Sequence, residues 1–131
     1  MEGGCLCGAI RFHAIGQPID ANYCHCSQCR RHTGAPVAAF AGFPIAHLVW
    51  SKGQPRVFAS SAKAHRSFCP DCGTSLTWQD LAEPDRIYLY VGAFNDPSSL
   101  YPRDHVWSEN AIPWLRIEDS LPRHKRTRRE G

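Results

Sequence analysis

Short runs in which apolar and polar residues alternate dominate the chain, and a period of two predicts β-strands rather than helices. Ile10, Phe12 and Ala14, for example, would lie on one face of a strand, with polar side chains between them. The predicted strands are Ala9–Ile15, Val37–Phe43, His47–Trp50, Arg56–Ala59, His65–Phe68, Thr74–Trp78, Arg86–Gly92 and Ile112–Ile117.

Gly, Pro, Asn or Asp follows each run closely, which favours frequent turns. Ser27–His32 and Pro97–Tyr101 are predicted as helical turns, the second opened by Asp96 as a cap with proline at its first position. Pro113 has no amide hydrogen, so the strand Ile112–Ile117 is expected at a sheet edge. The pattern as a whole predicts an all-β domain of packed, short antiparallel sheets with few helical turns.

The 131 residues correspond to one domain, and the hydrophobic fraction of 43% and charged fraction of 21% are globular values. No apolar run approaches the ~20 residues that a membrane span needs, so we expect no membrane partner. The N-terminal residues lack the basic start and apolar stretch of a secretory signal. This favours a reducing, cytoplasmic location.

The positive charge is concentrated at the C-terminus. Residues 121–131 contain five Lys or Arg and one Glu, whereas residues 1–120 contain ten basic and eleven acidic side chains. We therefore divide the chain into a folded domain at 1–120 and a basic, mobile tail at 121–131. A body with so little positive charge does not favour nucleic acid as a partner.

Seven cysteines form three clusters with the spacings C-x-C, C-x-C-x-x-C and C-x-x-C. Close-spaced thiolates on tight turns are the usual donors of structural zinc sites, which take four ligands. Pro and Gly around the C-x-x-C pair allow a turn whose amides point at sulfur. The first and last clusters together supply a complete structural set: Cys5, Cys7, Cys69 and Cys72.

The middle cluster, Cys24, Cys26 and Cys29, leaves three thiolates within six residues. Three protein ligands leave the fourth position of a zinc ion open, which is typical of a catalytic site. Arg30 and Arg31 follow directly. Their guanidinium groups would balance the negative site or receive carboxylates of an incoming ligand.

Other interpretations of the cysteines remain at this point. His32 would close the second site as a fourth, structural ligand, whereas His25, between two metal-directed cysteines, should point away. Disulfide exchange at the Cys26–Cys29 pair and seven inert buried cysteines fit the clustering less well.

Three stretches, Gly3–Phe12, Tyr23–Arg30 and Phe68–Gly73, resemble the glutathione-dependent formaldehyde-activating enzyme (GFA) family, part of the wider group that includes centromere protein V. All seven cysteines match that family in order and spacing. His105–Trp107 and Ala111–Trp114 resemble its C-terminal portion more loosely.

The resemblance implies an Mss4-like, all-β fold stapled by two zinc ions, one structural with four cysteine ligands and one open with three. It also implies a carbon–sulfur lyase that adds glutathione reversibly to formaldehyde or a related small aldehyde, giving S-(hydroxymethyl)glutathione. Cys24, Cys26 and Cys29 would be catalytic, and Arg30 and Arg31 would bind the co-substrate glutathione. Further candidate neighbours of the site are His25, His32, His105 and Trp107.

The alternative hypothesis is a non-catalytic, zinc-stabilised binding module. In that case a sheet face or the basic tail at 121–131 would recognise the partner.

Overall fold

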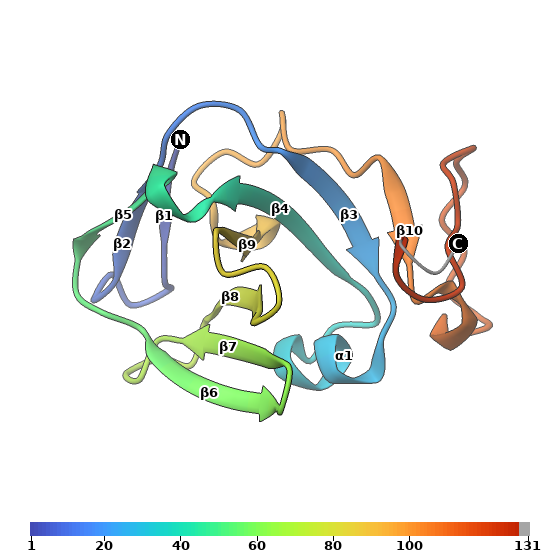
Figure 1. The fold of residues 1–131 in the computed structure, drawn as a ribbon, viewed down its shortest axis with the longest axis horizontal. Coiled ribbons are helices and arrows are strands. Elements are labelled where there is room, and N and C mark those ends of the chain that lie inside the picture. The colour runs from blue at the N-terminus through green and yellow to red at the C-terminus, as the bar shows by residue number, and fades with distance from the viewer. Residues whose placement is uncertain (129–131) are drawn as a thin grey trace.

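The computed structural model describes residues 1–128, which fold into two β-sheets with one α-helix beside them (Figure 1). The smaller sheet has the strand order β1-β2-β5, all antiparallel, and comprises β1 (Glu2–Gly4), β2 (Arg11–Ala14) and β5 (Leu48–Lys52).

The larger sheet has seven strands in the order β10-β3-β4-β9-β8-β7-β6. All its neighbours are antiparallel except β10 and β3, which run parallel. Its strands are β3 (Asp20–Cys24), β4 (Ala38–Pro44), β6 (Arg56–Ser61), β7 (Ala64–Phe68), β8 (Ser75–Asp80), β9 (Arg86–Tyr90) and β10 (Asp104–Val106).

The helical elements that lie wholly within the described residues are α1 and three short 3₁₀ turns. Helix α1 (Ser27–Thr33) begins after Cys26, its N-cap, and ends at Gly34, whose φ of 71° is the left-handed conformation that favours glycine. The 3₁₀ turns are η1 (Ile45–His47), η2 (Val91–Ala93) and η3 (Ser108–Asn110). No helix in residues 1–128 is long and apolar enough to cross a membrane.

The central strands of the larger sheet are buried on both faces. In β9, Leu89 belongs to one hydrophobic cluster, whereas Tyr88 and Tyr90 belong to another. Because successive side chains of a strand point to opposite faces, the two clusters lie on opposite sides of the sheet. Cys5 and Cys69 belong to the first cluster and Cys24 and Cys29 to the second, so the sheet separates the two candidate metal sites.

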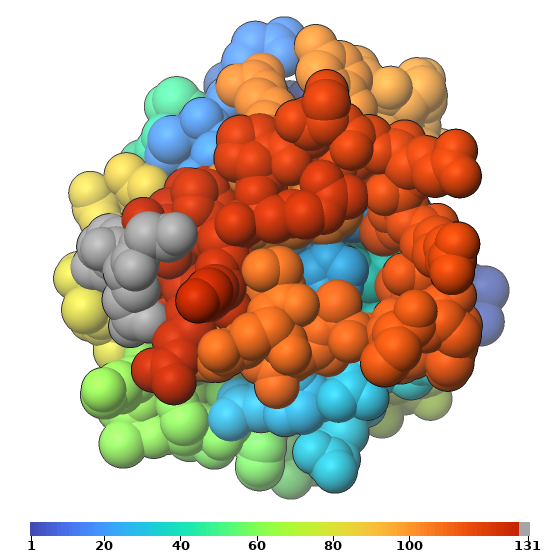
Figure 2. Space-filling view, turned by 90° about the vertical axis from the view of Figure 1, so that its right-hand side faces the viewer, coloured from blue at the N-terminus to red at the C-terminus, as the bar shows by residue number. Residues whose placement is uncertain are grey.

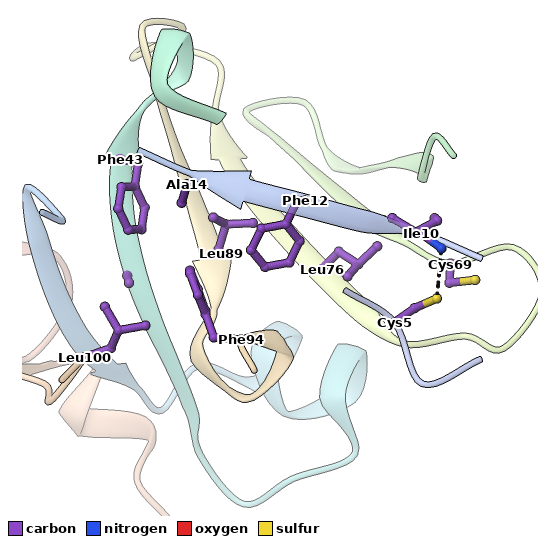
Figure 3. Close-up of a cluster of buried hydrophobic side chains, with 11 residues drawn as sticks. Cys5, Ile10, Phe12, Ala14, Phe43, Cys69, Leu76, Leu89, Phe94 and Leu100 are labelled. Atoms are coloured by element: carbon purple, nitrogen blue, oxygen red, sulfur yellow. Dashed lines mark hydrogen bonds between the residues drawn. The ribbon is translucent and has the colours of Figure 1, made fainter. Parts of the chain in front are cut away.

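The first cluster fills the space between the two sheets. Phe12 of β2 packs edge-on against Trp50 and Phe94, with ring centroids 5.9 and 5.1 Å apart. Figure 3 shows Cys5 and Cys69 at one end of this cluster, beside Ile10. The four-cysteine set therefore joins the N-terminal segment to the main sheet at the margin of the core.

Seven of the eight predicted strands are present with shifts of a few residues at their ends, and the helical turn predicted at Ser27–His32 is α1. The prediction of a mostly β fold with antiparallel sheets is confirmed.

The predicted strand Ile112–Ile117 is wrong. The segment is irregular, Leu115 turns back to bond the carbonyl of Ile112, and Trp114 is 70% exposed. Pro97–Tyr101 forms one hydrogen-bonded turn and no helix: the amide of Leu100 bonds the carbonyl of Pro97. Asp96 accepts from the amide of Ser98 at 3.1 Å, as the predicted cap would.

Three strands were not predicted, namely β1, β3 and β10. Gly3 in β1 is needed because a Cβ there would lie 2.4 Å from the carbonyl oxygen of Ala93. Polar residues interrupt the apolar pattern of β3 and β10, yet Asn22, Asp104 and His105 are buried in the structure. Their strands are held by pairing within the large sheet rather than by intrinsic propensity.

The segment after β10 packs on the body. The amide of His124 donates to the carbonyl of His105, and the amide of His105 donates to the carbonyl of Pro122. Arg128 pairs with Asp20 and Asp104. Figure 2 shows this segment in orange and red wrapping over one side of the molecule, with blue atoms visible in a hollow between its turns. The domain boundary at residue 120 stays a prediction, and residues 129–131 of the predicted tail lie outside the described residues.

Candidate functional site

The first cysteine set brings together residues far apart in the sequence. Cys7 Sγ lies 3.6 Å from Cys5 Sγ and 3.8 Å from Cys69 Sγ, and Cys72 belongs to the same group within 4.8 Å. Sulfurs arranged tetrahedrally around zinc, each at ~2.3 Å, are about 3.8 Å apart. The spacing and the donor type of this group therefore fit a zinc ion.

Backbone amides point at the sulfurs of the set. Cys5 Sγ accepts from the amide of Ile10 at 3.2 Å, and Cys69 Sγ accepts from the amides of Asp71 and Cys72, both at 3.4 Å. Gly73, with φ of 79°, lets the turn close behind the second cysteine. Hydrogen bonds of this kind stabilise the thiolate form that a metal ion requires.

The second set lies where β3 passes into α1. Cys24 ends the strand, Cys26 caps the helix, and Cys29 occupies its first turn. The Sγ atom of Cys29 is 3.0 Å from that of Cys26 and 3.2 Å from that of Cys24, so one ion is able to contact all three. Cys24 and Cys29 are buried.

The neighbouring thiols and backbone prepare Cys26 to ionise first. Contact with Cys24 and then with Cys29 lowers the pKa of the Cys26 thiol to about 2, and the amide of Cys29 also donates to it at 3.3 Å. The contact with Cys26 raises the pKa of Cys24 far above its ordinary value. The first negative charge of the trio therefore resides on Cys26.

Arg66 of β7 is a neighbour that the sequence analysis missed. Its side chain is buried, and its two terminal nitrogens lie 3.5 and 3.6 Å from Cys29 Sγ. The positive charge predicted from Arg30 and Arg31 of α1 is thus supplied at the sulfur by strand β7. The residues around Arg66 have the alternating pattern of an ordinary exposed strand, so the sequence does not indicate that Arg66 is buried. Its pairing opposite Trp78 of β8 places it on this face of the sheet.

Tyr90 and His32 hold Arg66 in place. Tyr90 Oη accepts from Arg66 Nη1 at 2.9 Å and lies 2.6 Å from His32 Nδ1. Burial, and secondarily the charge of Arg66, lowers the pKa of His32 to about 4, so this imidazole is neutral at pH 7. Within residues 1–128 the ligand group contains the three sulfurs alone. The geometry therefore does not support the alternative in which His32 closes the site.

His25 points away from the sulfurs, as its position between two ligands predicts. Its Nε2 atom lies 2.8 Å from Nδ1 of His105, whose Nε2 lies 2.9 Å from a carboxylate oxygen of Asp119. Tyr23 stacks on His105 with ring centroids 4.8 Å apart. His105 is thus a supporting residue behind the cysteine loop rather than part of a pocket.

Arg30 and Arg31 line a hollow of about 320 Å³ at the far end of α1, with Gly34, Ala35, Pro36 and Ile112. The Nε atom of Arg30 is buried and has no hydrogen-bond partner among the described residues. Trp107 packs against the second hydrophobic cluster with Val106 and Trp78. The arginines therefore lie near the second cysteine set but face a separate hollow.

Comparison with known proteins agrees with this arrangement. The family model of the glutathione-dependent formaldehyde-activating enzyme matches residues 1–110. The chain belongs to this family. Both cysteine sets lie within the matched GFA region.

The individual relatives of this GFA-family chain share only 27–37% sequence identity with it. A Halomonas elongata protein, provisionally named a glutathione-dependent formaldehyde-activating enzyme, is 28% identical over 127 residues, 90% of this chain and 81% of that protein. A Schizosaccharomyces pombe protein named an uncharacterised lyase is 37% identical over 75 residues, 57% of this chain and 54% of its own length. The crystal structure of a Rhodobacter sphaeroides protein matches with a TM-score of 0.62 and 27% identity, covering 76% of this chain and 94% of that one.

Proposed function

We propose that the chain catalyses the reversible addition of glutathione to formaldehyde or a related small aldehyde, as a carbon–sulfur lyase of the S-(hydroxymethyl)glutathione synthase type. The observation that carries the proposal is the trio Cys24, Cys26 and Cys29, whose sulfurs converge without a fourth ligand among the described residues. Membership of the GFA family and the lyase-named relative support the reaction class.

The two cysteine sets would have separate roles. Cys5, Cys7, Cys69 and Cys72 would hold a structural zinc ion, and Cys24, Cys26 and Cys29 a second one. Bound by three thiolates, the second ion would supply the charge that keeps a substrate thiol deprotonated at neutral pH.

The protein side chains would then bind and orient the reactants. Arg30 and Arg31 would receive carboxylates of glutathione in the hollow beside α1. They lie a little over one helical turn after Cys26, the N-cap of α1. The rings of Phe40, Tyr88 and Tyr90 lie in the same cluster as Cys24 and Cys29 and exclude water from that side. Positioning of thiolate and aldehyde would supply rate through effective molarity.

The bond changes balance without a redox partner. The sulfur electron pair forms the C–S bond, the carbonyl π pair moves to oxygen, and that oxygen takes up one proton. In the reverse direction the hydroxyl loses its proton as the C–S bond breaks.

The test is the rate of exchange between free glutathione and its formaldehyde adduct, followed by NMR exchange spectroscopy against the uncatalysed background. Cys26→Ser should abolish the acceleration while the protein stays folded. Arg30→Met and Arg31→Met should each raise the KM for glutathione about tenfold, the loss of one charge-assisted hydrogen bond. With 2-mercaptoethanol, which has no carboxylate, the same variants should match the wild type.

An unchanged exchange rate in Cys26→Ser would refute the proposal and favour the non-catalytic binding module. The basic tail offers that alternative little support. Among its described arginines, Arg123, Arg126 and Arg128 already pair with carboxylates of the body.

A further inference from the structure

The buried guanidinium of Arg66 needs an anion, and the described residues offer it only sulfur. Arg66 is 4% exposed, and no carboxylate in residues 1–128 pairs with it. Its hydrogen bonds go to Cys29 Sγ and to Tyr90 Oη, and its buried Nε has no partner there. A buried charge is costly unless it is paired, so the fold retains Arg66 for the charge of the cysteine trio.

The position of this charge is fixed. The Tyr90 hydroxyl lies between Arg66 and His32, at 2.9 and 2.6 Å, and both partners come from elements packed against the trio. Arg30 and Arg31, in contrast, are at the margin of the site, and Arg31 is exposed. Among the residues that the structure describes, Arg66 is thus the cation that contacts a metal-directed sulfur within the interior.

Charge counting shows what this contact does. Three thiolates around a divalent ion carry one net negative charge, which would repel an anionic fourth ligand. The guanidinium of Arg66 brings the local charge to zero. In a partly dehydrated site, one charge at this range changes the affinity for an anion strongly and the affinity for a neutral donor little.

We propose that Arg66 is a specificity-determining residue: it makes the second cysteine site accept an anionic fourth ligand, such as a thiolate, in preference to a neutral one. The inference rests on the proposed function, because it assumes that a metal ion occupies the trio and that a visiting ligand completes it.

Cobalt substitution provides a test that does not depend on turnover. Visible absorption of the Co²⁺-loaded protein reports ligand exchange at cobalt, and azide and imidazole serve as an anionic and a neutral probe. Arg66→Met should weaken azide binding at least tenfold and imidazole binding less than twofold. Arg66→Lys, which keeps the charge, should hold azide affinity within about threefold of the wild type. Arg56→Met, an exposed arginine on the adjacent strand β6, is the matched control and should change neither.

Equal losses for both probes, or no loss for either, in Arg66→Met would overturn the inference. Should the methionine variant fail to fold, Arg66→Lys decides alone: retained azide affinity supports the charge argument, and a tenfold loss contradicts it. The wild-type exchange assay separates the two proposals. Suppose that azide binding depends on Arg66 as predicted but the wild type does not accelerate adduct exchange. That pair of results would refute the proposed enzymatic function and would still support the role of Arg66.

Discussion

Arg128 anchors the C-terminal segment to the edge of the large sheet. Its guanidinium donates to Asp104 from two nitrogens and to Asp20 at 2.9 Å. The Asp104 side chain is 10% exposed, and His124 is its only other ionic partner among the described residues, at 3.3 Å. Arg128→Ala would leave this carboxylate buried and largely uncompensated.

Breaking a fully buried pair by removing one partner costs about 3–5 kcal/mol, whereas exposed pairs contribute below about 1 kcal/mol. The Arg128 side chain is 35% exposed, so solvent screens part of the interaction. We therefore expect a loss of about 2 kcal/mol in the free energy of unfolding.

The assay is urea unfolding followed by circular dichroism at a fixed zinc concentration, with the free energy taken from the midpoint and slope. Arg126→Ala is the matched control, because the Arg126–Glu109 pair is 57% and 40% exposed. It should lose less than about 0.5 kcal/mol. A loss below about 0.5 kcal/mol in Arg128→Ala would show that its ion pairs do not anchor residues 121–128. Equal losses in the two variants would show that the burial of Asp104 adds nothing to the Arg128 pair.

Three further predictions concern the cysteine sites and their neighbours. Cys72→Ser should not fold at 25 °C, because a structural zinc site contributes ~10–16 kcal/mol, which exceeds the stability of a typical domain. A cooperative unfolding transition in Cys72→Ser, like the one expected for Cys26→Ser, would contradict this prediction. Tyr90→Phe removes the hydroxyl that bonds His32 and Arg66, and calorimetry should show a loss of about 1–2 kcal/mol. Because the folded pKa of His32 is about 4, the unfolded chain protonates first as the pH falls from 6.5. The free energy of unfolding of the wild type, relative to that of His32→Gln, should therefore be constant above pH 6.5 and fall by about 2 kcal/mol towards pH 4. A difference that does not change with pH would refute this prediction.

Much of the cysteine chemistry was predictable from the sequence, because short spacings keep donors together in any fold. Cys24, Cys26 and Cys29 lie within six residues, and the turn around Cys69 and Cys72 carries its own Pro and Gly. The pairing of the first and last clusters required only that four ligands complete a zinc site. The structure brings the sulfurs together in these same groups.

The surroundings of the second set were not predictable in the same way. Arg66 is 37 residues from Cys29, and its burial follows from the pairing of β7 with β8. Nothing local distinguishes it from an exposed strand arginine. His105 likewise reaches His25 across 80 residues, through a parallel strand pair that no local pattern indicates.

Errors in the predicted strands have a common physical cause. Alternation in Ile112–Ile117 predicted a strand, but a strand also needs a partner, and Pro113 lacks the amide that pairing would use. In β3, Asp20 and Asn22 lower the strand propensity, yet hydrogen-bonded pairing with β10 on one edge and β4 on the other holds the strand. Sheet pairing therefore overrode the local signal in both directions.

The most direct test of the three-sulfur site is X-ray absorption at the zinc edge on reduced protein loaded with two equivalents of zinc, recorded with and without glutathione. Sets of four and three cysteines predict an average of 3.5 sulfur ligands per zinc ion, rising to 4 when glutathione binds. A spectrum that already shows a complete protein ligand set and does not change with glutathione would contradict a substrate thiolate at this site.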